Sequence, residues 1–167
     1  MVKVILHVYH GTKCEPGQTS NTVMKVNRMF KDIMGIGGIF HSAVQVYGDV
    51  EWSFGFGKSG SGVFRSPAGK NSQYTHYERI VLGETDISKN EVNHILVELI
   101  SEWPAATYDL LARNCNHFCN ELCGRFGVPK PPGWINRFAN AGHAATKTVV
   151  NTSSWVNSRS SVWDGVR

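Results

Sequence analysis

The sequence has few of the features that would place it in a membrane or on nucleic acid. No stretch of its 167 residues approaches the run of about 18 apolar residues that a membrane-spanning helix needs. Its 17 basic and 13 acidic residues leave a formal charge of +4, and no run of like charges concentrates it. We therefore expect no membrane span and no nucleic-acid partner, because mixed charge of this kind indicates an ordinary solvated surface.

Cysteine is also scarce, and the first residues are too polar for a signal peptide. The four cysteines, Cys14, Cys115, Cys119 and Cys123, are few for a secreted protein built on disulfides. Residues 1–9 are rich in branched and aromatic side chains in partial alternation, which predicts a first strand. These features favour a reduced intracellular compartment, and we expect a cytoplasmic protein with the nucleus as a second location.

The apolar content of 41% and charged content of 18% are typical of one globular domain. Residues 2–9, 41–46, 50–56 and 77–82 read as strands, and Gly48-Asp49 suits the turn between the second and third. Residues 58–75 are polar and read as a long exposed loop. Helices are expected over 21–34, 89–103, 116–126 and 134–138, and the second of them begins with a capping box from Ser88 to Glu91. Strands and helices without regular alternation predict an α+β fold.

The most informative residue is Cys115, in the segment Asn114–Phe118, where irregular chain gives way to an amphipathic helix. Unpaired N–H groups and the positive end of the helix dipole favour a thiolate at such a position, so we expect a nucleophile near neutral pH. The N–H of Cys115 itself is the first candidate to stabilise an oxyanion.

His41 is the expected partner of this thiol, because it opens an apolar run that predicts a rigid strand. An imidazole there would accept the thiol proton and later deliver it to a leaving amine. We predict that the His41 and Cys115 side chains lie within hydrogen-bonding reach or a small adjustment of it. His117 is the rival base, but residues two apart on a helix do not face each other.

The residues that would support this pair are not decided by the sequence. Asn114, Asn116, Tyr9 and Trp52 are all candidates to stabilise the oxyanion or to orient His41. Taken alone, Cys115 and His41 also fit buried packing and structural roles. A zinc site from Cys115, His117, Cys119 and Cys123 is a further alternative, but paired C-x-x-C spacing is absent and we expect no metal.

These segments together resemble the PPPDE family, the permuted papain-like peptidases that include desumoylating isopeptidases and related deubiquitinating enzymes. The likeness covers Val4–Tyr9, Gly38–Gly48, Glu51–Gly55, Val81–Asp86, Asn114–Phe118 and Val128–Arg137. The histidine precedes the cysteine, which fits the permuted order of that family. The resemblance implies a circularly permuted papain-like α+β fold with a small antiparallel sheet packed against helices. It also implies a peptidase domain over residues 1–142, followed by a tail over 143–167 whose role is unclear.

The resemblance further implies a cysteine isopeptidase that removes ubiquitin or SUMO from lysine through a His41/Cys115 dyad and an acyl-enzyme, without a cofactor. The Val46-Tyr47-Gly48 run, the Asn114–Phe118 block and Trp134–Arg137 look like the ubiquitin branch. Because ubiquitin-like tails end in glycine, we expect a narrow groove. Its lining would include glycines at positions Gly35, Gly37, Gly38, Gly55 and Gly57.

Two other functions remain open at this point. A cysteine thioesterase acting on acylated proteins would use the same nucleophile and oxyanion site. A non-catalytic adaptor would bind a ubiquitin-like protein through exposed loops and Trp155 or Trp163. The sequence does not fix the oligomeric state, and a homodimer is among the options.

Overall fold

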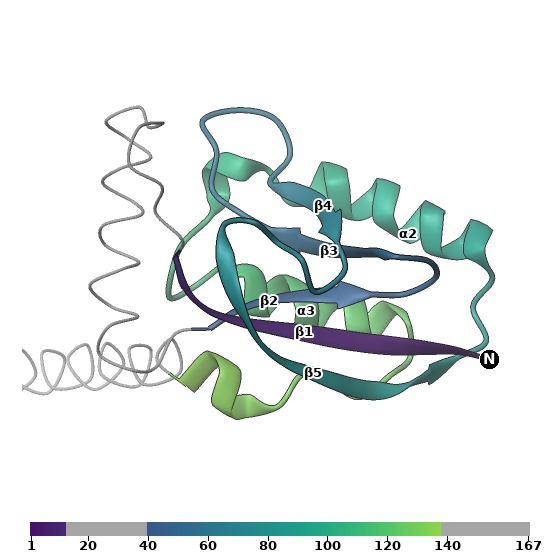
Figure 1. Ribbon diagram of the computed structural model, residues 1–167. Coiled ribbons are helices and arrows are strands. Elements are labelled where there is room, and N and C mark those ends of the chain that lie inside the picture. Colours follow the sequence, from purple (N-terminus) through teal and green to yellow (C-terminus); the bar gives the residue numbers. More distant parts are fainter. Residues whose placement is uncertain (13–39, 138–167) are drawn as a thin grey trace, which may run out of the picture.

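The computed structural model describes residues 1–12 and 40–137, and every element below lies in those two ranges. Five strands form one antiparallel sheet in the order β4-β3-β2-β1-β5. The strands are β1 (Val2–Thr12), β2 (His41–Gln45), β3 (Val50–Phe54), β4 (Val63–Pro67) and β5 (Tyr74–Thr85). The helices are α2 (Lys89–Glu102) and α3 (Cys115–Arg125), with short 3-10 turns η1 (Ala105–Thr107) and η2 (Gly133–Asn136). The sheet and helices confirm the predicted α+β class (Figure 1).

The two faces of the sheet differ because side chains alternate along each strand. Val4, Leu6 and Val8 of β1 are fully buried on the face that α2 and α3 cover, which we call the helix face. Figure 1 shows α3 behind β1 and β2, with α2 running beyond β3. Leu99 of α2 and Phe118 of α3 close this core, so apolar packing joins both helices to the sheet.

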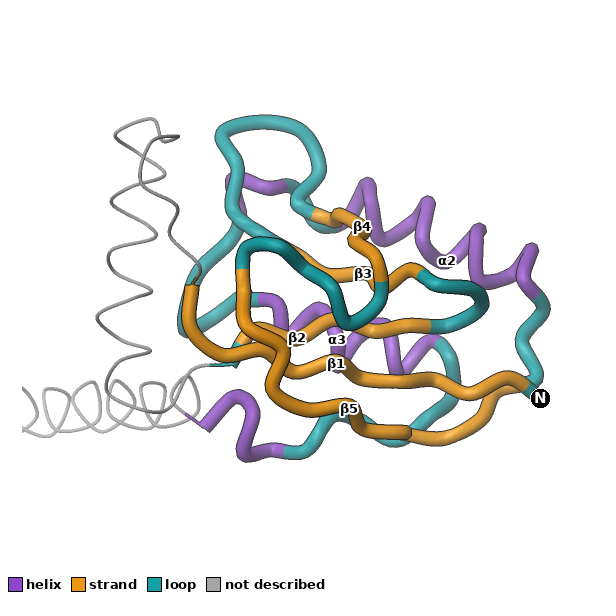
Figure 2. Tube along the Cα trace, in the orientation of Figure 1, coloured by secondary structure: helices purple, strands orange, loops and turns teal. Residues whose placement is uncertain are grey.

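The opposite side, which we call the outer face, carries mainly polar side chains. They are His7, Tyr9, His41, Gln45, Glu51 and Ser53, from the three central strands. The chain between β4 and β5 passes over this face, as Figure 2 shows, and the backbone N–H of Gly69 donates to the Glu51 carboxylate at 2.9 Å. Among the described residues, the chain between β4 and β5 therefore covers the outer face.

Local sequence signals set the helix ends. Ser88 and Glu91 form the predicted capping box, and α2 ends at Glu102, with Trp103 as its C-cap immediately before Pro104. Asn114 caps α3 by accepting hydrogen bonds from the N–H groups of Asn116 at 2.9 Å and His117 at 3.1 Å. Because Asn114 is the cap, Cys115 is the first residue of α3.

Two expectations need correction. The predicted loop over 58–75 contains β4 and the start of β5, because an edge strand is exposed and keeps polar residues such as Arg65 and Ser66. The short helix expected over 134–138 is the 3-10 turn η2. By contrast, Gly48-Asp49 lies in the β2–β3 turn as expected, with positive φ angles at Tyr47 (48°) and Gly48 (72°).

Other sequence predictions lie outside the described residues. These are the helix over 21–34, the end of the domain at residue 142 and the tail over 143–167. Within residues 1–12 and 40–137, neither helix has the length and apolar character needed to cross a bilayer.

Candidate active site

The segment before α3 is tied down by the side chain of its cap residue. The Asn114 amide donates to the carbonyl of Leu110 at 2.8 Å and to Oδ1 of Asn136 at 3.0 Å, while its Oδ1 caps the helix. Asn114 thereby joins the approach to α3, the helix itself and η2. The backbone around Cys115 is held from three directions.

The Cys115 thiol is buried among hydrogen-bond donors. The backbone N–H groups of Ser42, Asn116 and Cys115 itself and the hydroxyl of Tyr108 favour its thiolate and lower its pKa. Burial nevertheless raises the pKa of Cys115 to about 11, because loss of solvent outweighs these donors. The expected depression of this pKa by the helix N-terminus is therefore wrong for this site, where Cys115 is only 2% exposed.

His41 is the first residue of β2 and is paired with Tyr9 of β1. Its ring lies 4.2 Å from the ring of Tyr74 with only 12° between their planes, and its Nε2 lies 3.2 Å from the Ser53 hydroxyl. Burial lowers the pKa of His41 to about 3. The imidazole is thus held neutral in a mostly aromatic environment.

Two neighbours connect His41 with Cys115. The backbone N–H that reaches the Cys115 sulfur belongs to Ser42, the residue next to His41. Tyr74, which stacks on His41, has its pKa raised by burial and also by the negative charge that Cys115 would carry. The two predicted residues therefore share neighbours at the end of the sheet where β2 and α3 begin, and a direct contact between their side chains stays a prediction.

The supporting candidates separate into two groups. Asn116 accepts from the Ser42 hydroxyl at 2.6 Å and donates to the carbonyl of Phe40 at 3.1 Å, so it fixes the chain on both sides of His41. The Tyr9 ring lies 6.0 Å from that of His41. Trp52 does not join them, because it is paired with Val44 and packs against the apolar core of the helix face.

The remaining sequence candidates have structural contacts of their own. Cys119 lies 3.3 Å from the Ser42 hydroxyl, and Cys123 is buried in the core. In the described part of the chain, no three His, Cys, Asp or Glu side chains gather as a metal site would require, so the zinc alternative gains no support. A side chain at Gly57 would meet Cβ of Ala105 at 2.9 Å, and one at Gly55 would meet the Phe64 ring at 3.2 Å. Close packing explains these two glycines, and the other three proposed for a groove lie outside the described residues.

Sequence reasoning missed Ser53, Tyr74 and Tyr108, all of which touch the candidate pair. A weak signal existed for Ser53, since it alternates with Trp52 and Phe54 in a strand expected to pair with that of His41. Tyr74 lay in the segment expected to be a loop. Tyr108 carried no local pattern that would aim its hydroxyl at Cys115.

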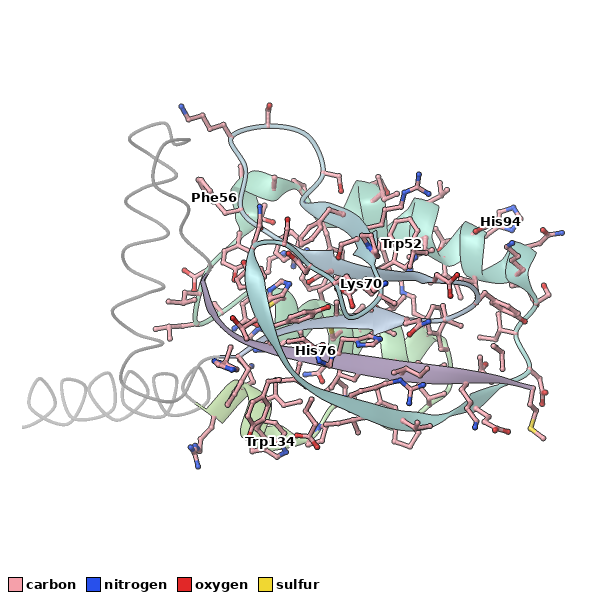
Figure 3. The ribbon with its side chains drawn as sticks, in the orientation of Figure 1. Trp52, Phe56, Lys70, His76, His94 and Trp134 are labelled. Atoms are coloured by element: carbon pink, nitrogen blue, oxygen red, sulfur yellow. The ribbon has the colours of Figure 1, made fainter. Side chains whose placement is uncertain are left out.

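Glu51 holds the outer face together next to this pair. Its buried carboxylate accepts from the Tyr9 hydroxyl at 2.6 Å, from the Ser66 hydroxyl at 2.9 Å and from the N–H of Gly69 at 2.9 Å. In Figure 3 Lys70 and His76 lie in front of the sheet, on the side opposite α3. Because the β4–β5 connection ends at Tyr74, these bonds fix the approach to the ring that covers His41.

A cysteine opening a helix and a histidine opening a neighbouring strand, on an α+β framework, form the arrangement expected of a cysteine hydrolase. The chain matches the model of the PPPDE putative peptidase domain over residues 2–154, and it belongs to that family.

Three relatives indicate where the chain stands within the family. It is 36% identical over 108 residues to a desumoylating isopeptidase 1 homolog of Caenorhabditis elegans, covering 62% of this chain and 32% of the relative. It is 32% identical over 106 residues to a DeSI-like protein of Arabidopsis thaliana, covering 63% and 47%. It is 30% identical over 117 residues to the DeSI-like protein sdu1 of Schizosaccharomyces pombe, covering 68% and 57%. The matches thus span between 32% and 57% of the length of these curated relatives.

Proposed function

We propose that this protein is a cysteine isopeptidase that releases a ubiquitin-like modifier from lysine, with Cys115 as nucleophile and His41 as the group that moves the proton. The observation that carries the proposal is the donor cluster around the Cys115 sulfur, which includes the N–H next to His41. Donors gathered at a nucleophile are suited to hold the oxyanion that forms when it attacks a carbonyl.

The reaction begins from a neutral pair, because burial keeps the thiol protonated and the imidazole unprotonated. As the sulfur–carbon bond forms, the thiol proton passes to His41 and the carbonyl oxygen becomes an oxyanion. The N–H of Cys115, with Tyr108 as a second donor, stabilises that charge. Collapse of the intermediate breaks the carbon–nitrogen bond, and His41 gives its proton to the lysine amine.

Water completes the cycle. It attacks the thioester while His41 accepts one of its protons, and the second tetrahedral intermediate expels the Cys115 thiolate and releases the modifier as a carboxylic acid, which loses its remaining proton to solvent. The proton then returns from His41 to the Cys115 sulfur, so both groups regain their starting states. No cofactor takes part in this scheme.

The substrate proposal rests on the names of the relatives and on sequence motifs. Desumoylation is named for the Caenorhabditis elegans relative, whereas the Trp134–Arg137 and Asn114–Phe118 motifs look like the ubiquitin branch. We therefore propose that the modifier is ubiquitin or SUMO. The proposed place of action is the cytoplasm, with the nucleus as a second location.

The decisive experiment treats the full chain with ubiquitin and SUMO probes that end in an electrophile and locates the adduct by mass spectrometry. Wild-type protein should form an adduct on Cys115 with one probe, and the Cys115→Ala variant should form none. His41→Ala should react more slowly by a factor of roughly 100 or more. His94→Ala, which changes an exposed histidine of α2, is the matched control and should react as wild type does.

Three outcomes would overturn the proposal. An adduct on Cys119 or Cys123 would show that one of these cysteines, and not Cys115, is the nucleophile. Absence of any adduct, together with hydrolysis of small thioesters, would identify a thioesterase acting on acylated proteins. Binding of ubiquitin or SUMO that is unchanged by Cys115→Ala, without turnover, would identify an adaptor.

A further inference from the structure

The hydrogen bonds of the Ser53 hydroxyl determine which nitrogen of His41 carries a proton. Ser53 Oγ lies 2.7 Å from the backbone carbonyl oxygen of Ser42 and 3.2 Å from Nε2 of His41. A carbonyl oxygen only accepts, so the single hydroxyl proton of Ser53 is donated to Ser42. The contact with His41 then requires Nε2 to be the donor and Ser53 Oγ the acceptor.

This assignment leaves Nδ1 as the basic nitrogen. A neutral imidazole has one N–H and one lone pair, so a proton on Nε2 places the lone pair on Nδ1. The plane of the ring is restrained as well, because the Tyr74 and Phe64 rings lie within 12° and 13° of parallel to it. Ser53 therefore selects the tautomer of His41, while the aromatic neighbours hold the orientation of its ring.

We propose that Ser53 is the positioning residue of this site, holding His41 as the Nε2–H tautomer so that Nδ1 accepts the Cys115 proton. The proposal rests on the proposed function of the Cys115/His41 pair and adds a third member to it. Ser53 is 1% exposed, and the carbonyl that takes its proton belongs to Ser42, whose own N–H reaches the Cys115 sulfur. Ser42 thus connects the Ser53 hydroxyl, through its carbonyl, with the Cys115 sulfur, through its N–H.

A hydroxyl in this role differs from a carboxylate. When His41 accepts the thiol proton it becomes a cation, and the Nε2–H bond to Ser53 Oγ then becomes charge-assisted and stronger. Ser53 carries no charge of its own, so it stabilises the cation less than an aspartate would. The resting pair consequently stays neutral, and the proton moves only as substrate is attacked.

The first test reads the tautomer directly in the full-length protein. Two-bond proton–nitrogen correlation spectra of nitrogen-15-labelled protein near neutral pH should show His41 with a protonated Nε2 and an unprotonated Nδ1. The Ser53→Ala variant should lose this preference and show averaged or reversed nitrogen shifts. A wild-type spectrum with the proton on Nδ1 would overturn the proposal without any variant.

The second test measures chemistry. Ser53→Ala should slow Cys115 alkylation by chloroacetamide, and its reaction with the preferred modifier probe, by roughly 10- to 100-fold. The loss should appear in the maximal rate and not in probe affinity, because Ser53 acts through His41. Ser101→Ala is the control serine, since its hydroxyl bonds to the carbonyl of Glu98 on the exposed surface of α2, and it should stay within about twofold of wild type.

The outcomes separate the two proposals. If wild type fails to react with either modifier probe, the proposed function fails, while the spectra and chloroacetamide still test Ser53. If the probes react but Ser53→Ala changes neither the tautomer nor the rate, the Ser53 proposal alone is wrong. If Ser53→Ala unfolds, the wild-type spectrum decides.

Discussion

The helix face and the outer face of the sheet are both buried, but by different means. On the helix face, Leu6, Leu99 and Phe118 are fully buried in apolar packing that has little directional requirement. On the outer face, Tyr9 and Glu51 are buried just as deeply, yet hydrogen bonds of fixed direction hold them. The comparison indicates that the helix face supplies most of the stability, whereas the outer face supplies the geometry of the site.

Replacing Glu51 with alanine should remove the hydrogen bonds that hold the outer face together. It should cause the largest combined loss of stability and of reaction rate. One buried donor and two partly buried donors would lose their acceptor, at about 1–3 kcal/mol for a donor that water does not reach. We expect a loss of about 3 kcal/mol or more in the free energy of unfolding. Reaction of Cys115 with the probe should fall by a factor of about 100, because Tyr74 would lose its anchored approach.

Urea unfolding and probe kinetics on the same samples would measure both effects of the Glu51 change. Ser66→Ala, which removes only one of the three donors, should cost about 1 kcal/mol. A Glu51→Ala variant that keeps the full reaction rate would show that the outer face does not organise the site.

Replacing Leu99 with alanine should disrupt packing on the helix face and lower the free energy of unfolding by a similar amount. The reaction of Cys115 should be unaffected. Leu99 is fully buried, so its truncation should lower the free energy of unfolding by about 3 kcal/mol. The rate of probe reaction per folded molecule should stay within about twofold of wild type. If the rate instead falls as far as in Glu51→Ala, the proposed division between the two faces is wrong.

The pH dependence of stability sharpens the comparison, because His41 is a titratable group on the outer face. The pKa of His41 is about 3 in the folded protein, below the ordinary value of 6.5. Between those two pH values, His41 binds a proton in the unfolded chain but not in the folded protein. Stability is therefore complete above about pH 6.5 and is lost as pH falls toward 3. At about pH 4.5 the loss from this group should be about 2–3 kcal/mol.

Urea unfolding of wild type and His41→Gln at about pH 6.5 and about pH 4.5 isolates the contribution of His41 to the pH dependence of stability. The other titrating groups are common to the two proteins. The variant should lose less stability on acidification than wild type. Equal losses would mean that His41 is more accessible to protons than its surroundings indicate.

The smallest effect is expected away from both faces, on the helical surface. Arg125 of α3 forms ion pairs with Glu98, Glu102 and Glu121, whose side chains are about half exposed. Arg125→Met should lower the free energy of unfolding by less than about 1 kcal/mol, and the difference should shrink in added salt. A larger, salt-independent loss would mean that the stem of Arg125 contributes to packing.

Much of this architecture is readable from local sequence. The Ser88–Glu91 capping box, the β2–β3 hairpin and the position of Cys115 at a helix start all depend on neighbouring residues, and all were predicted. The strand at Val63–Pro67 was not, since its polar residues belong to a sheet edge that only pairing with β3 defines. A local sequence pattern therefore identifies helices and strands, whereas an edge strand is recognised only when the strand that it pairs with is known.

In the candidate site, too, local features could be predicted and features that depend on distant segments could not. His41 and Cys115 stood out because each begins an element, but their protonation could not be predicted. The raised pKa of Cys115 comes from burial by distant segments, and a helix-terminus argument alone has the wrong sign. The contact of Ser53 with His41 depends on the β2–β3 register and on the carbonyl of Ser42, which no residue pattern reveals.

The contacts of Asn114 and Asn116 with η2 carry a consequence for synthesis of the chain. Both amides donate to Oδ1 of Asn136, and Ile135 beside it is buried in the core. During translation, β1 to α3 emerge before Asn136 does, so the sheet can form while the cap of α3 still lacks this partner. We expect a nascent chain that ends before η2 to have an unorganised Cys115, whose reactivity would then be delayed until residues 133–136 have left the ribosome.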